Sequence, residues 1–219
     1  DPILTTLLHT INNSNFDGIL IGGSDIDLEG YEHRLKFIKK STSMPIMLFP
    51  GSSTHINKHI DTMLYLNLIS GRNPKYLIEE HVSGAMKIYN NNISTIPTAY
   101  ILLEGGAQSS VELVSDTQPI PIEQHDVILA HALAGEYLGK SLIFFESGSG
   151  ANQHISCELL AYIKPYLTIP IIVGGGINTA ETANALVNAG ADYIVIGSKL
   201  EGITSKAELI DFTQAVHQD

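Results

Sequence analysis

The chain carries, at residues 171–178, the stretch Ile171-Ile172-Val173-Gly174-Gly175-Gly176-Ile177-Asn178. Its apolar first part, which begins at Ile169, suits a fully buried strand. Asn178 can cap a helix, and Glu181 follows it at the spacing of a capping box. Because glycine lacks a Cβ, its backbone amides can approach a ligand closely, and the free N–H groups at a helix start attract anions. The stretch therefore predicts a strand, a turn and a helix around an anion, such as a phosphate.

Alone, the glycine run is ambiguous, because a tight turn between strand and helix with no ligand has the same sequence. A second apolar segment, Tyr193-Ile194-Val195-Ile196, ends in Gly197-Ser198 one unit later. Two glycine turns after successive strands favour a phosphate site over a simple turn.

The composition limits the classes of protein that the chain can belong to. A length of 219 residues with 44% hydrophobic residues suits one globular domain, 1–219, with a full core. The net charge of -11 argues against a nucleic-acid surface, so an anionic ligand must be held by local backbone donors or a metal. Cys157 is the only cysteine, which excludes an intrachain disulfide. With no apolar run long enough to span a membrane and no signal peptide seen, we expect a cytoplasmic protein.

Apolar segments alternate with helical patterns along the chain. We predict strands at 18–21, 45–49, 63–69, 98–103, 141–145, 169–173 and 193–196. We predict helices at 3–12, 31–40, 54–61, 74–89, 123–137, 157–166, 179–189 and 205–217, and an irregular segment at 107–118. Such alternation indicates a parallel sheet with helices outside it.

Polar residues end nearly every predicted strand. This favours a closed barrel over an open doubly wound sheet, which would bind ligands at a single switch point. We therefore expect a modified (β/α)8 TIM barrel, in which Asp1-Pro2 is the visible part of strand one. In that fold, phosphate commonly binds after strands seven and eight, where the two glycine turns fall.

A few side chains at these strand ends could take part in chemistry. Glu146 is the main candidate for a general base, because it ends a strand and precedes a glycine-rich loop; alternatively, it orients that loop or caps the next helix. Asp1 and Ser24 together suit a magnesium site, although Ser24 could instead cap a turn. Arg72 either contacts a diphosphate or braces its own loop. Glu104 ends a neighbouring strand and suits a supporting or surface role equally well.

These motifs resemble the geranylgeranylglyceryl phosphate synthase family, which includes bacterial heptaprenylglyceryl phosphate synthases. The similarity extends over nearly the whole chain and is closest to the family's second group. The matching segments are Asp1-Pro2, Gly22-Gly23-Ser24, Phe49-Pro50-Gly51, Ile69-Ser70-Gly71-Arg72-Asn73-Pro74, Pro119-Ile120-Pro121, Ala132-Leu133-Ala134-Gly135-Glu136, Glu146-Ser147-Gly148-Ser149-Gly150, Val173-Gly174-Gly175-Gly176-Ile177 and Gly197-Ser198.

The resemblance implies a modified (β/α)8 barrel that joins a polyprenyl diphosphate, such as geranylgeranyl diphosphate, to sn-glycerol 1-phosphate as an ether and releases diphosphate. It implies that Asp1 and Ser24 hold Mg2+ and that Glu146 takes the proton from the attacking hydroxyl group. It also implies a homo-oligomer, either a dimer or a hexamer, and we expect transient membrane contact for the lipid product. The glycerol phosphate would be held by Phe144, Phe145, Glu146, Ser147, Gly148, Ser149, Gly150, Gly174, Gly175, Gly176, Gly197 and Ser198. Phe144 stands where the family usually has tyrosine.

Two other classes of function remain open on the sequence. One is a different phosphate-binding barrel enzyme, such as an isomerase or a flavin enzyme; an aldolase is disfavoured because Lys199 lies outside a strand. The other is an inactive barrel that binds glycerol phosphate. The sequence predicts neither the length of the prenyl chain nor the depth of the groove that would hold it.

Overall fold

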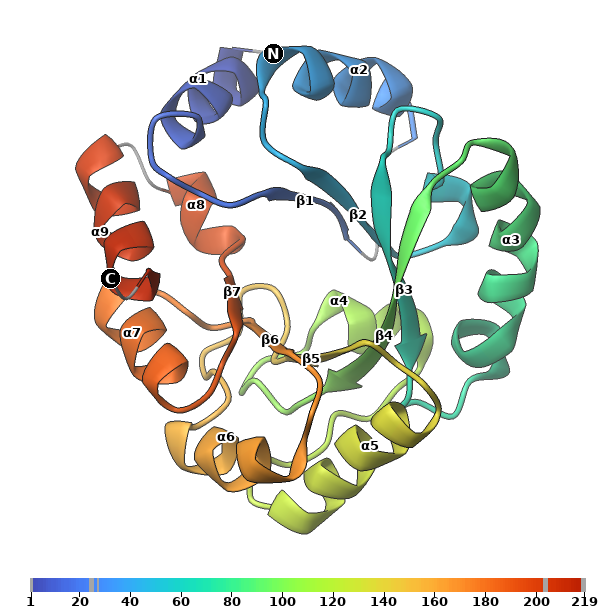
Figure 1. The fold of residues 1–219 in the computed structure, drawn as a ribbon, viewed down its shortest axis with the longest axis vertical. Helices are drawn as coiled ribbons and strands as arrows, with labels where there is room; N and C mark the ends of the chain where they lie inside the picture. Colours follow the sequence, from blue (N-terminus) through green and yellow to red (C-terminus); the bar gives the residue numbers. More distant parts are fainter. Residues whose placement is uncertain (1, 24–25, 27, 203–204, 218–219) are drawn as a thin grey trace.

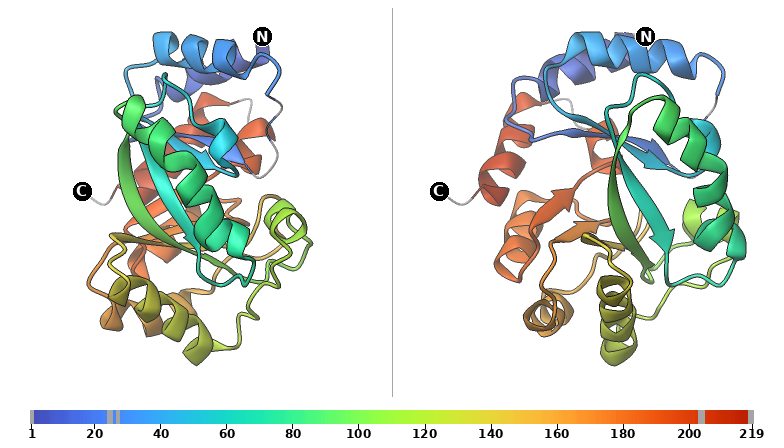
Figure 2. Two further views of the ribbon diagram at one scale, coloured as in Figure 1. Left: turned by 90° about the vertical axis from the view of Figure 1, so that its right-hand side faces the viewer. Right: turned by 45° about the vertical axis from the view of Figure 1, so that its right-hand side comes forward.

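The computed structural model describes residues 2–23, 26, 28–202 and 205–217. In this part of the chain, seven parallel strands form one sheet in the order of the sequence. The strands are β1 (Ile19–Gly23), β2 (Ile46–Pro50), β3 (Thr62–Leu68), β4 (Ser94–Leu102), β5 (Leu142–Glu146), β6 (Ile171–Gly174) and β7 (Tyr193–Val195). The sheet curls around its own interior, with helices outside it (Figures 1 and 2). The prediction of a parallel α/β barrel is confirmed in its main features.

The barrel is open between its two edge strands. Among the described residues, β1 pairs only with β2, and β7 pairs only with β6. Helices α1 (Pro2–Ile11) and α9 (Lys206–Val216) contact one another outside this gap (Figure 1). The described strands therefore form a curled sheet and not a closed ring of eight.

The expected remnant of strand one is not observed. Pro2 begins helix α1, whose Leu8 and Ile11 are buried, and Asp1 lies outside the described residues. A proline at a helix start loses no hydrogen bond, and apolar residues at helical spacing provide a buried face. These two effects make the segment from Pro2 a helix, so that part of the fold prediction was wrong.

The remaining helices are α2 (Tyr31–Ser41), η1 (Ser53–His55), η2 (Lys75–Glu79), α3 (Glu80–Asn90), α4 (Ser110–Ser115), α5 (His125–Tyr137), α6 (Cys157–Ile163), η3 (Lys164–Tyr166), α7 (Ala180–Asn188) and α8 (Ser198–Gly202). Of these helices, α2, α3, α5, α6 and α7 lie around the outside of the sheet, whereas α4 lies at one end of it (Figure 1). No helix in the described ranges is both long and apolar enough to cross a bilayer.

Three local predictions were wrong, each because of short-range hydrogen bonds. The segment 107–118 contains helix α4, which Ser109 and Glu112 start with a capping box. The expected helix 54–61 is only the single turn η1, because the Asn57 side chain accepts a hydrogen bond from the His59 amide. Thr179, and not Asn178, caps α7.

The two faces of the sheet have different surroundings, and this places the site. Ile143 and Phe145 of β5 pack outward against the helix layer, together with residues of α5, α6 and α7. Phe144 points to the other face, into an interior cluster with Leu64 and Tyr100. Because side chains alternate along a strand, Glu146 shares the inward direction of Phe144.

Candidate active site

Glu146 lies in a polar cleft at the carboxyl ends of the strands. The cleft encloses about 1030 Å³ of empty space, part of it open to solvent. Its described lining comes from β1, β5, β6 and β7 with the loops that follow them, and also from β2, β4 and α4. The lining residues are Gly22, Gly23, Phe49, Tyr100, Ser110, Val111, Glu146, Gly148, Ser149, Gly150, Ala151, Gly175, Gly176, Ile177, Asn178, Val195, Ile196, Gly197, Ser198 and Lys199. The glycine turns at 174–176 and 197–198 thus meet around one cleft, as expected.

The environment of Glu146 makes it a suitable proton acceptor. Burial raises the pKa of its carboxyl group from the ordinary 4.5 to about 7, and a hydrogen bond from the Gly148 amide to Oε1, at 2.7 Å, opposes that rise. A base with a pKa near the working pH combines a useful fraction of the ionised form with a strong affinity for the proton.

The absence of side chains in the glycine run also leaves space for the Glu146 carboxylate. A Cβ at Gly174 would lie 2.9 Å from Oε2 of Glu146, and one at Gly175 would lie 2.6 Å from Oε1. Gly175 and Gly176 have φ values of 84° and 71°, a region that side-chain-bearing residues seldom adopt. The run is therefore required both by the turn itself and by the close approach of Glu146.

Backbone groups and serine hydroxyls dominate the wall opposite Glu146. The hydroxyl groups of Ser149 and Ser198 lie 2.8 Å apart and connect the loop after β5 to the start of α8. Lys199 is the only lysine or arginine among the described lining residues, and its ammonium group pairs with Glu208 at 2.9 Å. An anion in this part of the cleft would be bound by N–H and O–H donors, as is usual for phosphates at glycine turns.

Several residues predicted from the sequence lie outside the described cleft lining. The Phe145 side chain packs against the outer helices, and the buried Ser147 hydroxyl has no hydrogen-bond partner. The Arg72 guanidinium donates to the carbonyl oxygens of its own loop, including that of Gly71 at 2.7 Å, which corresponds to the bracing alternative. Asp1 and Ser24 lie outside the described residues.

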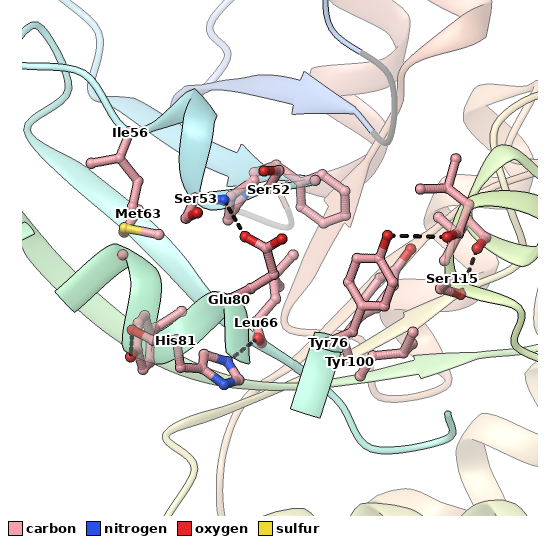
Figure 3. A pocket seen from close by; sticks show the side chains of 18 of the residues that line it. Ser52, Ser53, Ile56, Met63, Leu66, Tyr76, Glu80, His81, Tyr100 and Ser115 are labelled. Atoms are coloured by element: carbon pink, nitrogen blue, oxygen red, sulfur yellow. Dashed lines mark hydrogen bonds between the residues drawn. The ribbon is translucent and has the colours of Figure 1, made fainter. Parts of the chain in front are cut away.

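A second, apolar pocket adjoins the cleft (Figure 3). It encloses about 740 Å³ of empty space between β3, α3 and α4. Its lining is Phe49, Pro50, Gly51, Ser52, Ser53, Ile56, Met63, Tyr65, Leu66, Leu68, Tyr76, Glu80, His81, Gly84, Ile88, Tyr100, Val111, Val114 and Ser115.

Several polar groups in this pocket are bound to its walls, whereas the Tyr100 hydroxyl group has no partner in the protein. Glu80 accepts a hydrogen bond from the Ser53 amide at 2.6 Å, and His81 Nε2 lies 2.6 Å from the Leu66 carbonyl oxygen. The Tyr76 hydroxyl donates to the Val114 carbonyl oxygen at 3.0 Å (Figure 3). With these groups satisfied by the protein, the remaining surface suits a hydrocarbon chain.

The cleft and the apolar pocket share three lining residues, Phe49, Tyr100 and Val111. The rings of Phe49 and Tyr100 are 5.6 Å apart, and Tyr100 meets Phe144 edge to face at the same distance. Our reading of the sequence missed Tyr100, although its inward position on a strand could have indicated it. The two hollows therefore adjoin at these residues, with the polar cleft on one side and the apolar pocket on the other.

The chain is similar to several known proteins. The model of the PcrB family matches residues 4–215. A geranylgeranylglyceryl phosphate synthase from Zunongwangia profunda is 45% identical over 183 residues, which cover 84% of this chain and 78% of that protein. The enzyme of the same name from Thermococcus kodakarensis is 40% identical over 186 residues, covering 84% and 73%. The crystal structure of (S)-3-O-geranylgeranylglyceryl phosphate synthase from Thermoplasma acidophilum, in complex with its substrate sn-glycerol-1-phosphate, superposes with a TM-score of 0.92 at 32% identity, covering 98% of this chain and 87% of that one.

Proposed function

This chain belongs to the PcrB family, and from that premise we propose that it is a prenyltransferase. It forms an ether bond between sn-glycerol 1-phosphate and a polyprenyl diphosphate such as geranylgeranyl diphosphate, releases diphosphate, and so serves ether phospholipid biosynthesis. The observation that carries this proposal is that a glycine-lined cleft with Glu146 adjoins an apolar pocket at Phe49, Tyr100 and Val111. Such a site matches one small anionic substrate and one long hydrocarbon substrate.

The acceptor, sn-glycerol 1-phosphate, occupies the polar cleft. Its phosphate lies against the loops at 148–150, 175–176 and 197–198, where backbone amides and the hydroxyl groups of Ser149 and Ser198 are the available donors. Its attacking hydroxyl group then faces Glu146. With a pKa of about 7, the ionised carboxylate of Glu146 can take the proton of that hydroxyl group at neutral pH.

The prenyl tail occupies the apolar pocket, and its first, allylic carbon lies at the shared floor. In the reaction, the acceptor oxygen forms a bond to this carbon, the bond from the carbon to the diphosphate oxygen breaks, and the acceptor proton passes to Glu146. The electron pair of the broken bond leaves with the diphosphate. Because the described walls at this point are Phe49, Val111 and the ring of Tyr100, water is excluded from the reacting carbon.

We also propose that the enzyme uses Mg2+. With Lys199 paired to Glu208, no other described lining side chain neutralises a diphosphate, which favours a divalent cation for this task. The described residues contain no cluster of three or more potential metal ligands, but Mg2+ can bind through one or two protein oxygens and the substrate phosphates. Asp1 and Ser24 would hold it near Gly22 and Gly23 of the cleft wall. When bound, the cation stabilises the charge on the departing diphosphate.

We further propose a homo-oligomer, a dimer or a hexamer, with transient membrane contact for the lipid product. Exposed apolar side chains along η2 and α3 support this, since Ile78 of η2 and Val82 and Met86 of α3 follow each other at helical spacing. Light scattering after size-exclusion chromatography distinguishes monomer, dimer and hexamer. The cytoplasmic location stays a prediction.

The function is tested by incubating the protein with labelled sn-glycerol 1-phosphate, Mg2+ and prenyl diphosphates of several lengths. We expect a labelled ether product that is extracted into organic solvent. Binding of glycerol phosphate without product from any prenyl diphosphate would reject the proposal and leave an inactive binding barrel.

A further inference from the structure

Tyr100 carries a buried hydroxyl group for which the protein provides no hydrogen-bond partner. The residue is only 4% exposed, and its ring is enclosed by Phe49 and Phe144. Buried hydroxyl groups are nearly always paired, because desolvation without a hydrogen bond is unfavourable. Tyr31, which is also buried, follows this rule, since its hydroxyl group donates to the His55 carbonyl oxygen. Three described buried hydroxyl groups have no partner in the protein, those of Tyr100, Thr117 and Ser147. Of these three residues only Tyr100 lines the cleft and the apolar pocket, which indicates that the partner of its hydroxyl group is a ligand.

The position of Tyr100 identifies which ligand group that partner is. Of the three described residues that line both the cleft and the apolar pocket, only Tyr100 has a polar side-chain atom, because the others are Phe49 and Val111. The parallel register of β4 and β5 places Tyr100 beside Phe144 and Leu102 beside Glu146. Tyr100 is thus one inward-facing position from the proposed base, and it lines both hollows where they adjoin.

We propose that the Tyr100 hydroxyl donates a hydrogen bond to the attacking hydroxyl group of sn-glycerol 1-phosphate and orients it toward Glu146 and the allylic carbon. This inference rests on the proposed function. The acceptor oxygen has two lone pairs, of which one accepts the bond from Tyr100 and the other attacks the carbon. Its proton goes to Glu146, and Tyr100 keeps its own proton throughout. Phe144, which has no hydroxyl group, cannot take this role.

The ionisation of Tyr100 agrees with a role as donor. Burial, and secondly the nearby Glu146 carboxylate, raise the pKa of the phenol well above its ordinary value of 10. The hydroxyl group therefore stays protonated while Glu146 titrates. Tyr100 therefore holds the acceptor oxygen, and Glu146 removes its proton.

The experiment compares the full-length wild type with Tyr100→Phe, which keeps the ring and removes the hydroxyl group. Calorimetry measures the affinity for sn-glycerol 1-phosphate and for propane-1,2-diol 1-phosphate, which lacks the terminal hydroxyl group. We expect the wild type to prefer the first ligand, and Tyr100→Phe to lose a factor of about three to ten of this preference, the range for one neutral hydrogen bond, while the share that comes from Glu146 remains. The turnover number should fall by about the same factor with an unchanged KM for the prenyl diphosphate.

Tyr31→Phe is the matched control, since the Tyr31 hydroxyl is also buried but donates to the His55 carbonyl oxygen at 3.1 Å. It should lower the melting temperature and leave the ligand preference unchanged, whereas Tyr100→Phe should keep or raise the melting temperature.

Three results would overturn the inference: an unchanged ligand preference in Tyr100→Phe, a loss of stability like that of Tyr31→Phe, or an effect confined to the KM of the prenyl diphosphate. A failure of the proposed function is distinguishable from these, because then the wild type itself would bind no glycerol phosphate or form no ether.

Discussion

Two opposing effects set the pKa of the Glu146 carboxyl group. Burial favours its neutral form, and the Gly148 amide at 2.7 Å favours the charged form, with a resulting pKa of about 7. Because burial disfavours the charged form of this carboxylate, its affinity for a proton is raised. A general base requires this property. The same residue should therefore be visible both in the pH dependence of the reaction and in the stability of the fold.

The first prediction concerns pH. Because the base must be ionised, kcat/KM for the acceptor should rise with pH and level off above an apparent pKa of about 7. The measurement is the initial rate of ether formation across this range at fixed Mg2+ and ionic strength. A rate that is flat between pH 6 and 8, about one unit on either side, would assign the proton transfer to another group.

Glu146→Gln should lower the turnover number by about 10²-fold or more and yet stabilise the protein at alkaline pH. The pKa of the carboxyl is raised on folding from 4.5 to about 7, so the native state binds the proton more tightly, and stability falls as pH rises through that interval. The neutral amide has no such loss. Thermal unfolding should thus show a higher melting temperature for Glu146→Gln above pH 7 and little difference below pH 4.5. An equal difference at both ends would contradict the titration of Glu146.

The glycines of the cleft differ in what they tolerate. Gly175→Ala should reduce both stability, by about 1–2 kcal/mol, and activity, because φ is 84° and the new Cβ would lie 2.6 Å from Oε1 of Glu146. Gly197→Ala is the matched control, since no atom lies within 4 Å of the added Cβ. It should have the wild-type free energy of unfolding. Urea titration measures this free energy for both variants. If Gly175→Ala lost no more stability than Gly197→Ala, the clash with Glu146 would be relieved easily.

At the scale of strands and helices, the features that depend on the local sequence pattern could be predicted. The order of strands and helices, Glu146 at a strand end and the two glycine turns all follow from periodicity and spacing. Helix α4 was missed, because a capping box in a polar segment is a weak signal. The apolar pocket could not be predicted, since β3, α3 and α4 supply its walls from distant parts of the chain.

Helix α4 should matter for the hydrocarbon substrate in particular. Val111, Val114 and Ser115 of α4 line the apolar pocket, and Ser109 caps the helix by accepting from the Glu112 amide at 3.1 Å. Ser109→Ala should cost about 1 kcal/mol of stability and raise the KM for the prenyl diphosphate severalfold.

Ser156→Ala provides the comparison for α4. Ser156 caps α6 in the same way, accepting from the Leu159 amide at 3.1 Å, but lines neither pocket. Its loss should destabilise the protein similarly and leave the KM unchanged. If both variants changed the KM alike, general loosening of the barrel, and not α4, would explain the effect.

For the molecule as a whole, charge is the main constraint on catalysis. A chain of net charge -11 must bind two phosphate-bearing substrates, and it brings a single lysine to the described cleft lining. The acceptor can be held by backbone donors, whose positive ends do not depend on the overall charge. The diphosphate, which carries more charge and gains further charge as it leaves, needs a stronger counter-charge.

Removal of divalent metal should therefore separate binding of the acceptor from catalysis. After treatment with EDTA, the protein should bind sn-glycerol 1-phosphate with an affinity within about twofold of the untreated value, since glycine-loop amides and serine hydroxyls hold its phosphate. Ether formation should fall to background and return when Mg2+ is added. Calorimetry measures the first quantity and incorporation of labelled glycerol phosphate the second. Loss of acceptor binding in EDTA would place the metal at the glycine loops, and undiminished turnover would show that the protein alone neutralises the departing diphosphate.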